Sequence, residues 1–368
     1  MKRLAVIPSD PIEEYIELGF SMEWLTSYYN PCKFFDEVYL LSPLEKDQPL
    51  LAGMKVFHTP VKDLKKRIKD LKIDVLRAYG GNWACRAACE NKVEGVPVVV
   101  SVHDRRPERL YNAVKNADIV LCVSQVVKEL VTKKFKKPDH IWILPNRVNF
   151  EIMRPIPAAQ QDKPDQQFSY KYKILFVGRL SEEKNLDTLI KALKFLGNDY
   201  GVLVIGRGEK RVYQDIALKE SVEKQCFFIE SVRNEDLPQY YSWCDCMCMP
   251  SRNEGFPKAF LEAMASEAVF VTSNIAPMNE FITDLDNGLL INEYENPQAL
   301  ADVIKRACTD NALRMNLKKN SRRSVERFEK GKIDKLEVEY YQKILTMKDQ
   351  GGFKVPFWKK AYLVIKTI

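Results

Sequence analysis

Short apolar runs alternate along the chain with stretches whose apolar residues recur every three or four positions. The first pattern predicts buried strands and the second predicts amphipathic helices, so their alternation indicates parallel sheets covered by helices. The predicted strands are residues 4–7, 37–41, 75–78, 96–102, 119–123, 141–144, 173–177, 202–205, 226–229, 246–249 and 269–272. The predicted helices include residues 61–71, 125–135, 185–196, 214–223, 237–243 and 257–266.

An interruption at residues 151–172 divides this pattern into two similar halves. Prolines and a run rich in Gln and Asp break the periodicity there, and after about residue 297 only helical patterns remain. A chain of 368 residues is long enough for two domains with separate cores. We therefore expect an α/β protein of two doubly wound parallel sheets, with the carboxyl ends of both sheets facing a shared cleft.

Composition narrows the class of protein. The hydrophobic fraction of 46% and the charged fraction of 29% are those of an ordinary globular protein. The nine cysteines lack metal-site spacing, and Cys244, Cys246 and Cys248 alternate as in a strand. No apolar run predicts a signal peptide or a membrane span. We expect a cytoplasmic protein, with attachment to the inner face of the plasma membrane as a second possibility.

The segment from residue 177 to residue 185 reads Val-Gly-Arg-Leu-Ser-Glu-Glu-Lys-Asn and joins a predicted strand to a predicted helix. Gly178 allows the backbone to turn tightly, and the start of the helix offers free N–H groups. Arg179 and Lys184 can both point at an anion above the sheet, where a fork and a point charge suit a diphosphate. The alternative is that both cations merely face solvent on a loop.

A second segment, from residue 251 to residue 262, reads Ser-Arg-Asn-Glu-Gly-Phe-Pro-Lys-Ala-Phe-Leu-Glu. Pro257 is expected in the first turn of a helix, which places Glu254 on the preceding loop. Glu262 follows two turns later among apolar residues, where a carboxylate is costly unless it gains partners such as a pair of hydroxyls. This spacing suits sugar recognition, although a glutamate on an ordinary amphipathic helix would look the same.

Together these segments resemble the nucleotide-sugar glycosyltransferases of family 4, the glycosyl transferases group 1, which are retaining enzymes with the GT-B fold. The resemblance rests on Glu-x7-Glu from Glu254 to Glu262 and on Gly-Arg-Leu-x-x-Glu-Lys-Asn from Gly178 to Asn185. Residues 204–208, 117–124 and 144–146 also match. The likeness is dense over residues 170–310 and thinner over residues 95–150.

The resemblance implies a division of the chain and a set of site residues. Residues 1–150 would form an acceptor-side domain, 151–172 a linker and 173–330 the nucleotide-sugar domain, with helices at about 331–368 packing back on the first. At the donor diphosphate we expect Arg179, Lys184 and Gly19. At the donor sugar we expect His103, Glu254, Gly255, Phe256 and Pro257. At the nucleoside we expect Glu262, Gly206, Ser231 and Val232. The expected catalytic residues are His103, Glu254, Arg179 and Lys184.

The resemblance further implies transfer with retention by front-face attack, without a metal, a protein nucleophile or a cofactor; the nucleoside diphosphate sugar is a substrate. In one departure, the loop after the first strand lacks the family's paired glycines, and Gly19 is their closest counterpart. The pair Gly206 and Gly208 does not continue as a dinucleotide fingerprint, because residue 211 is Arg, which disfavours a dehydrogenase.

The net charge of +7 is unevenly distributed. Residues 51–150 carry 20 Lys and Arg against 10 Asp and Glu, and residues 301–368 carry 17 against 8. Lysines recur on one face of the helix predicted at residues 61–71, and the tail from residue 353 is basic and aromatic. These surfaces could meet an anionic membrane, but a solvated helix face and a tail packed on the first domain are the simpler readings. Nucleic acid is a disfavoured partner, since no aromatic platform accompanies the basic residues.

The sequence thus predicts a hexosyltransferase that acts on a surface-glycan or lipid-linked acceptor. A sugar-nucleotide epimerase or hydrolase of similar fold is one alternative, and a non-catalytic sugar-nucleotide-binding subunit is another. The altered loop at residues 8–21 favours the latter, whereas the intact pair Glu254 and Glu262 argues against it. The donor base stays open between UDP, GDP and ADP.

Overall fold

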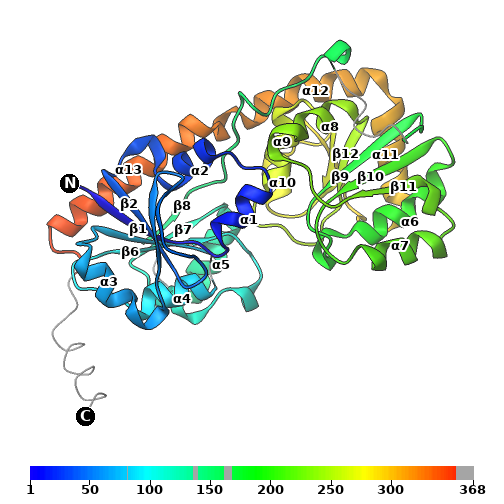
Figure 1. Cartoon of the computed structure of the whole chain (residues 1–368). Helices are drawn as coiled ribbons and strands as arrows, with labels where there is room; N and C mark the ends of the chain where they lie inside the picture. Colours follow the sequence, from blue (N-terminus) through cyan, green and yellow to red (C-terminus); the bar gives the residue numbers. More distant parts are fainter. Residues whose placement is uncertain (81, 136–139, 161–167, 354–368) are drawn as a thin grey trace. The chain divides into compact units, whose positions relative to one another are not determined.

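The computed structural model describes residues 1–80, 82–135, 140–160 and 168–353 (Figure 1). The chain divides into two compact units, each with its own sheet. The first unit consists of residues 1–16, 20–144 and the described residues from 334 onward. The second unit consists of residues 17–19 and 145–333.

An eight-stranded sheet forms the centre of the first unit, with the strand order β3-β4-β2-β1-β5-β6-β7-β8. The neighbours pair in parallel except β3 and β4, which are antiparallel. The strands are β1 (Arg3–Ile7), β2 (Glu37–Ser42), β3 (Gln48–Leu51), β4 (Met54–His58), β5 (Val75–Tyr79), β6 (Val98–Val102), β7 (Ile119–Cys122) and β8 (Ile141–Ile143). The main helices are α1 (Ile12–Glu17), α2 (Met22–Tyr29), α3 (Leu64–Asp70), α4 (Trp83–Glu90), α5 (Gln125–Phe135) and α13 (Lys330–Asp349).

A six-stranded, wholly parallel sheet forms the centre of the second unit, with the order β11-β10-β9-β12-β13-β14. The strands are β9 (Tyr172–Val177), β10 (Tyr200–Ile205), β11 (Cys226–Ile229), β12 (Cys246–Met249), β13 (Phe270–Ser273) and β14 (Leu289–Ile291). The helices are α6 (Leu186–Leu196), α7 (Lys210–Lys219), α8 (Leu237–Trp243), α9 (Lys258–Ala265), α10 (Met278–Phe281), α11 (Pro297–Thr309) and α12 (Asn311–Val325).

The strand order of the second unit reverses between β9 and β12. Successive strands from β9 run outward to β11 on one side, and those from β12 run outward to β14 on the other. At such a switch point the loops after the two neighbouring strands diverge and leave a crevice, where ligands of open α/β sheets bind. A ligand is therefore expected at the loops that follow Val177 and Met249.

Burial explains why these sequences form this sheet. The central strands β10 and β12 are buried along their whole length, so they read as continuous apolar runs. Helix α6 buries one face that includes Leu186, Leu189 and Leu193, and it packs against α11. Helix α11 begins at Pro297, and the side chain of Asn296 accepts hydrogen bonds from the first free N–H groups.

The described part of α13 beyond residue 333 packs on the first unit. Arg77 on β5 and Glu337 on α13 are almost fully buried, with Nη2 and Oε1 3.5 Å apart. Arg77 also donates to the Ser101 hydroxyl at 2.8 Å, and the Tyr340 hydroxyl donates to the carbonyl of Ile143 at 2.9 Å. Polar contacts thus join α13 to β5 and β8 within the first unit.

The elements differ from the hydrophobic pattern in identifiable places. Strands β3, β4 and β14 and helices α1, α2, α4 and α10 were not predicted, since most are short and β3 is an exposed edge strand. Helix α7 lies at Lys210–Lys219 rather than at 214–223, because Glu209 caps its start and the chain leaves the helix at Glu220. The described parts of residues 151–172 group with the second unit, where Phe168 packs against Trp243 and Phe227.

Candidate active site

The loop between β9 and α6 runs in direct backbone contact with the loop between β10 and α7. The Leu180 N–H donates to the carbonyl of Arg207 at 2.8 Å. A side chain at Gly206 would overlap the carbonyl of Gly178, and Gly208, with φ +144°, faces the carbonyl of Leu180. These glycines therefore allow two loops to touch. The part of Gly206 in nucleoside binding stays a prediction.

The same loop brings Lys184 to Glu254. Lys184 ends a short 3₁₀ turn, Glu182–Lys184, whereas Glu254 lies on the loop after β12. The Lys184 Nζ donates to Glu254 Oε1 at 2.6 Å, and the Ser251 hydroxyl donates to the same oxygen at 2.7 Å. The two charged side chains are 13% and 5% exposed. Each charge thus offsets the cost of burying the other, at the switch point of the sheet.

Arg179 is placed differently from Lys184. Its side chain is 66% exposed, and its guanidinium lies 3.6 Å from Glu183, one helical turn along the chain. Such exposed pairs are weak, so Arg179 can reorient toward an incoming anion at little cost. The structure therefore does not bring the two cations of the predicted diphosphate site together on one partner, and their joint role stays a prediction.

The residues after Glu254 form the start of α9. Phe256 is buried, with its ring centroid 4.6 Å from that of Phe281 and 5.0 Å from that of Phe328. Its carbonyl accepts a hydrogen bond from Asn146 Nδ2 at 2.5 Å. Pro257 is the N-cap residue, with ψ 136°, rather than the first-turn residue that the sequence predicted. Because the Phe256 ring is packed in the core, a ligand at this loop could contact the backbone of Phe256 but not its ring.

Glu262, on α9, has two polar partners within the second unit. Asn234 Nδ2 donates to one carboxylate oxygen at 3.1 Å, and the Tyr241 hydroxyl donates to the other at 3.2 Å. Burial raises the pKa of this carboxyl, although Asn234, Lys258 and Tyr241 each act to lower it. Burial also lowers the pKa of Lys258, one turn earlier, to about 8. The contact of Glu262 with the nucleoside stays a prediction.

Asn234 and Tyr241 are the partners that sequence reasoning missed. Ser231 and Val232, the predicted base contacts, are an exposed and a partly buried residue in the loop just before Asn234. A signal was present, because a predicted carboxylate on an apolar helix face requires a donor. The sequence alone did not show which donor it was, since α8 and α9 are neighbours only in the fold.

Two predicted residues lie away from the Lys184–Glu254 pair in the chain. His103 directly follows β6 in the first unit and is partly buried. Gly19 has φ +80° and groups with the second unit, where a Cβ would come 2.6 Å from the Cα of Arg233. Only glycine fits that approach without strain. The proposed contacts of His103 and Gly19 with a donor stay predictions.

In residues 1–353, apart from the undescribed gaps, no group of three or more His, Cys, Asp or Glu side chains is placed to hold a metal ion. None of the helices that the structure describes is long and apolar enough to span a bilayer. Helix α3 exposes Lys65, Lys66 and Lys69 and buries Leu64 and Ile68. All but the first residue of the predicted tail, 353–366, falls outside the described residues.

Two family models match the chain. The model described as Glycosyl transferases group 1 matches residues 159–324, and the model described as Glycosyltransferase Family 4 matches residues 12–152. The first match contains the loop with Lys184, the loop with Glu254, and Glu262. The second contains His103 and Gly19. Together the two models match most of the chain.

Individual relatives agree with this assignment. The chain is 26% identical, over 72% of its length and 74% of the relative's, to an uncharacterized glycosyltransferase of Methanocaldococcus jannaschii. It is 23% identical, over 57% of each chain, to the capsular polysaccharide biosynthesis glycosyltransferase CapM of Staphylococcus aureus. The alignments span between 44% and 74% of the curated relatives' own lengths.

A solved structure shows the fold. The chain superposes on Anabaena HepE, solved in complex with UDP-glucose, with a TM-score of 0.77 and 17% identity, over 92% of this chain and 99% of that one. This likeness confirms the GT-B fold that the sequence predicted.

Proposed function

Because this chain belongs to the group 1 glycosyltransferases of family 4, we propose that it transfers a hexose from a nucleoside diphosphate sugar to a surface-glycan or lipid-linked acceptor. The observation that carries the proposal is the pair of Lys184 and Glu254. A cation and a carboxylate meet at 2.6 Å on the loops after β9 and β12, the two strands that flank the switch point. A sugar diphosphate offers an anion to the first and hydroxyls to the second.

The proposed reaction exchanges one bond at the anomeric carbon. The bond from C1 to the β-phosphate oxygen breaks, an acceptor oxygen bonds to C1 from the same face, and the acceptor proton passes to the departing phosphate. Lys184 and Arg179 stabilise the negative charge that develops on the leaving diphosphate. Glu254 accepts hydrogen bonds from the sugar hydroxyls and fixes the ring, and Glu262 accepts from the ribose. Retention of the anomeric configuration follows from same-face attack.

The comparisons support the substrate classes of this proposal. The relative CapM is named for capsular polysaccharide biosynthesis, which favours a glycan or lipid-linked acceptor. HepE was solved with UDP-glucose, which makes UDP-glucose the first donor to try. The contacts that we propose for the nucleoside base are backbone groups and small side chains near Ser231 and Val232. Because such contacts do not favour one base over another, UDP, GDP and ADP sugars are all tested.

Donor binding and turnover test the proposal. The wild-type protein is incubated with UDP-glucose, UDP-galactose, GDP-mannose and ADP-glucose, and nucleoside diphosphate release is measured with and without a polyprenyl-linked glycan acceptor. Lys184→Met and Glu254→Gln should each lower turnover at least a hundredfold while the fold, by circular dichroism, is kept. Lys194→Met is the matched control, because Lys194 lies on α6, the helix that follows Lys184, and its side chain is 60% exposed, 3.6 Å from Glu220. It should behave as wild type.

The alternatives give different outcomes in the same assay. Acceptor-independent release of nucleoside diphosphate at the full rate would favour a hydrolase, and a donor converted to its epimer would favour an epimerase. Nucleotide binding that stabilises the protein, without turnover of any donor, would favour a non-catalytic binding subunit. An inverted product anomer, measured by proton NMR, would refute the retaining mechanism.

An anionic membrane is the partner that we propose for the basic face of α3. The support is that Lys65, Lys66 and Lys69 are exposed while the opposite face is buried. Basic residues near an anionic surface gain about 1 kcal/mol each. Flotation with phosphatidylglycerol vesicles tests this partner. Lys65→Glu combined with Lys69→Glu should abolish flotation, and unchanged flotation would exclude this face.

A further inference from the structure

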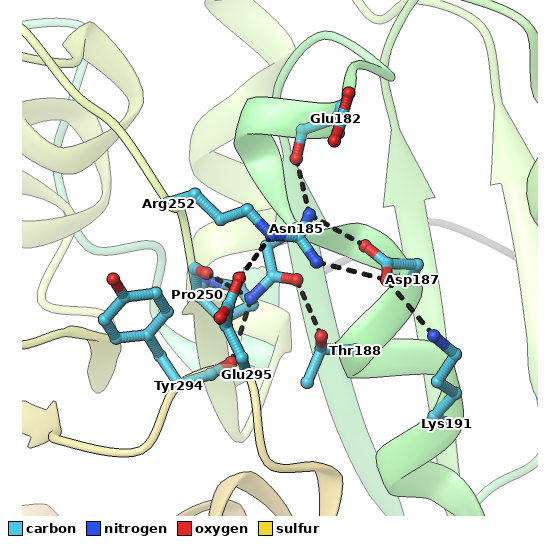
Figure 2. Close-up of polar contacts among 9 residues, drawn as sticks. All are labelled: Glu182, Asn185, Asp187, Thr188, Lys191, Pro250, Arg252, Tyr294 and Glu295. Atoms are coloured by element: carbon cyan, nitrogen blue, oxygen red, sulfur yellow. Dashed lines mark hydrogen bonds and ion pairs between the residues drawn. The ribbon is translucent and has the colours of Figure 1, made fainter.

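Three polar side chains connect the chain segments that carry Lys184 and Glu254, and Figure 2 shows the contacts of these three side chains. We call Asn185, Asp187 and Arg252 the loop clamp. Asn185 and Asp187 belong to the chain that enters α6, whereas Arg252 belongs to the loop after β12. The clamp thus connects the segments that follow the two strands at the switch point.

Asn185 uses its whole side-chain amide to join three segments. It is fully buried and has a left-handed backbone conformation, with φ 56° and ψ 34°. Its Nδ2 donates to the carbonyl of Pro250 at 2.8 Å and to the carbonyl of Tyr294 at 2.9 Å. Its Oδ1 accepts from the Thr188 hydroxyl at 2.6 Å. Pro250 directly follows β12, and Tyr294 lies between β14 and α11, so one side chain holds the loops after three strands.

Arg252 makes the second connection. Its backbone N–H donates to the carbonyl of Glu183 at 2.8 Å, and its Nη1 donates to the carbonyl of Glu182 at 2.7 Å. Its two terminal nitrogens bond the two carboxylate oxygens of Asp187 at 3.1 and 3.2 Å, while Nε bonds Glu295 at 2.8 Å. This fork geometry is specific to arginine, because a lysine offers only one charged point.

Asp187 is held in its charged form by this contact. Burial acts to raise the pKa of its carboxyl, but the hydrogen bonds and charges of Arg252 and Lys191 outweigh burial and lower the pKa below its usual value. The Arg252–Asp187 connection is therefore intact at neutral pH.

We infer that Asn185 and Arg252 are positioning residues for the sugar transfer proposed above, on which this inference rests. They act through Lys184 and Glu254, holding the diphosphate-binding cation and the sugar-binding carboxylate at a fixed separation. A left-handed turn by itself needs only glycine. The turn does not require the side-chain amide of Asn185, which is buried and donates hydrogen bonds to carbonyls of two other loops.

This role predicts a particular kinetic pattern. Misplacement of a reacting group by about 1 Å can cost about a hundredfold in rate. Asn185→Gly keeps the left-handed turn and removes only the ties, so kcat should fall by about 10- to 100-fold. The dissociation constant for UDP should rise by a smaller factor than kcat falls, because Lys184 supplies only part of the proposed UDP contacts and the nucleoside contacts lie elsewhere. The kcat of Arg252→Lys should fall in the same way, since a lysine cannot form the forked hydrogen bonds of the arginine guanidinium.

The experiment combines three measurements on the full chain. Steady-state kinetics with UDP-glucose, or with the donor that the wild type turns over in the panel above, gives kcat and KM. Calorimetry gives UDP affinity, and hydrogen exchange without nucleotide reports the amides at residues 178–185 and 250–255. Both segments should exchange faster together in Asn185→Gly. Lys194→Met serves again as the control and should change none of these quantities.

Three results decide the inference. A kcat of Asn185→Gly within twofold of wild type would overturn it, as would equal proportional losses of kcat and of UDP affinity. In the Lys184→Met background, Asn185→Gly should produce a smaller further loss than in the wild type, because part of its effect passes through Lys184; full additivity would overturn the inference. A wild-type protein that turns over no donor would instead refute the proposed function, which keeps the two failures distinguishable.

Discussion

Removing Lys184 leaves a buried carboxylate without its counter-charge. Glu254 is 5% exposed, and its remaining partner at Oε1 is the neutral Ser251 hydroxyl, 2.7 Å away. Breaking a buried ion pair by truncating one partner costs about 3–5 kcal/mol, whereas an exposed pair is worth about 0–1 kcal/mol. Because both side chains of the Lys184–Glu254 pair are largely buried, the cost should lie nearer to that of a buried pair. We expect Lys184→Met to lower the free energy of unfolding by about 2–4 kcal/mol.

The loss should not be symmetric. In Glu254→Gln the lysine keeps a flexible stem and is already 13% exposed, so its ammonium can move into water. We expect this variant to lose only about 1–2 kcal/mol, the scale of a lost hydrogen bond to a charged group. The double variant Lys184→Met with Glu254→Gln buries no charge. It should therefore be at least as stable as Lys184→Met alone, with a coupling energy of about 2 kcal/mol.

Urea unfolding followed by circular dichroism measures these differences, provided that the m-value stays constant between variants. Lys194→Met removes an exposed cation from α6, the helix that follows Lys184, and should cost less than about 0.5 kcal/mol. If the losses in Lys184→Met and Glu254→Gln add within about 0.5 kcal/mol, the charges do not compensate each other and the reasoning is wrong. The test does not depend on any donor or acceptor.

Three further predictions concern other parts of the two units. Glu337→Gln should destabilise the first unit by several kcal/mol, because it removes the counter-charge of fully buried Arg77. A urea unfolding curve indistinguishable from that of the wild type would show that the Arg77–Glu337 contact does not stabilise the unit. Since the pKa of Lys258 is lowered to about 8 in the folded state, the unfolded chain binds more protons above pH 8. Stability should therefore rise with pH between about 8 and 10 through this group, and Lys258→Met should flatten that rise in a pH series of unfolding midpoints, whereas an unchanged slope would exclude the group. Gly206→Ala should displace the loop at Gly178, because the added methyl overlaps its carbonyl, and a crystal structure with an unmoved loop would contradict this.

The sequence predicted several elements of the core at their observed residues, because buried positions are occupied by apolar residues and their spacing shows the type of element. Helices α5 and α8 and strands β11 and β12 lie at the predicted residues. The short edge strands β3 and β14 escaped prediction, since β3 is largely exposed and the three residues of β14 are too few to show a period. The start of α7 was misplaced by four residues because a charged first turn looks like a loop.

The candidate site was predicted as a set of residues and not as an arrangement. The resemblance to a known family implied that Lys184, Glu254 and Glu262 carry chemistry, and the residues alone indicated only that Glu262, among apolar neighbours, needs a partner. The resemblance assigned Lys184 and Glu254 to different parts of the donor, however. Their contact at 2.6 Å joins residues 70 positions apart.

What the sequence determined by itself is therefore the class of fold, the strands that carry the site and the kinds of side chain at their ends. These are local properties, set by periodicity and by the motifs after β9 and β12. Only the tertiary structure decided which side chains meet, such as Asn234 and Tyr241 at Glu262, and Arg252 at Asp187. The physical reason is that partners of buried polar groups are chosen by strand order and helix packing, which bring distant segments together.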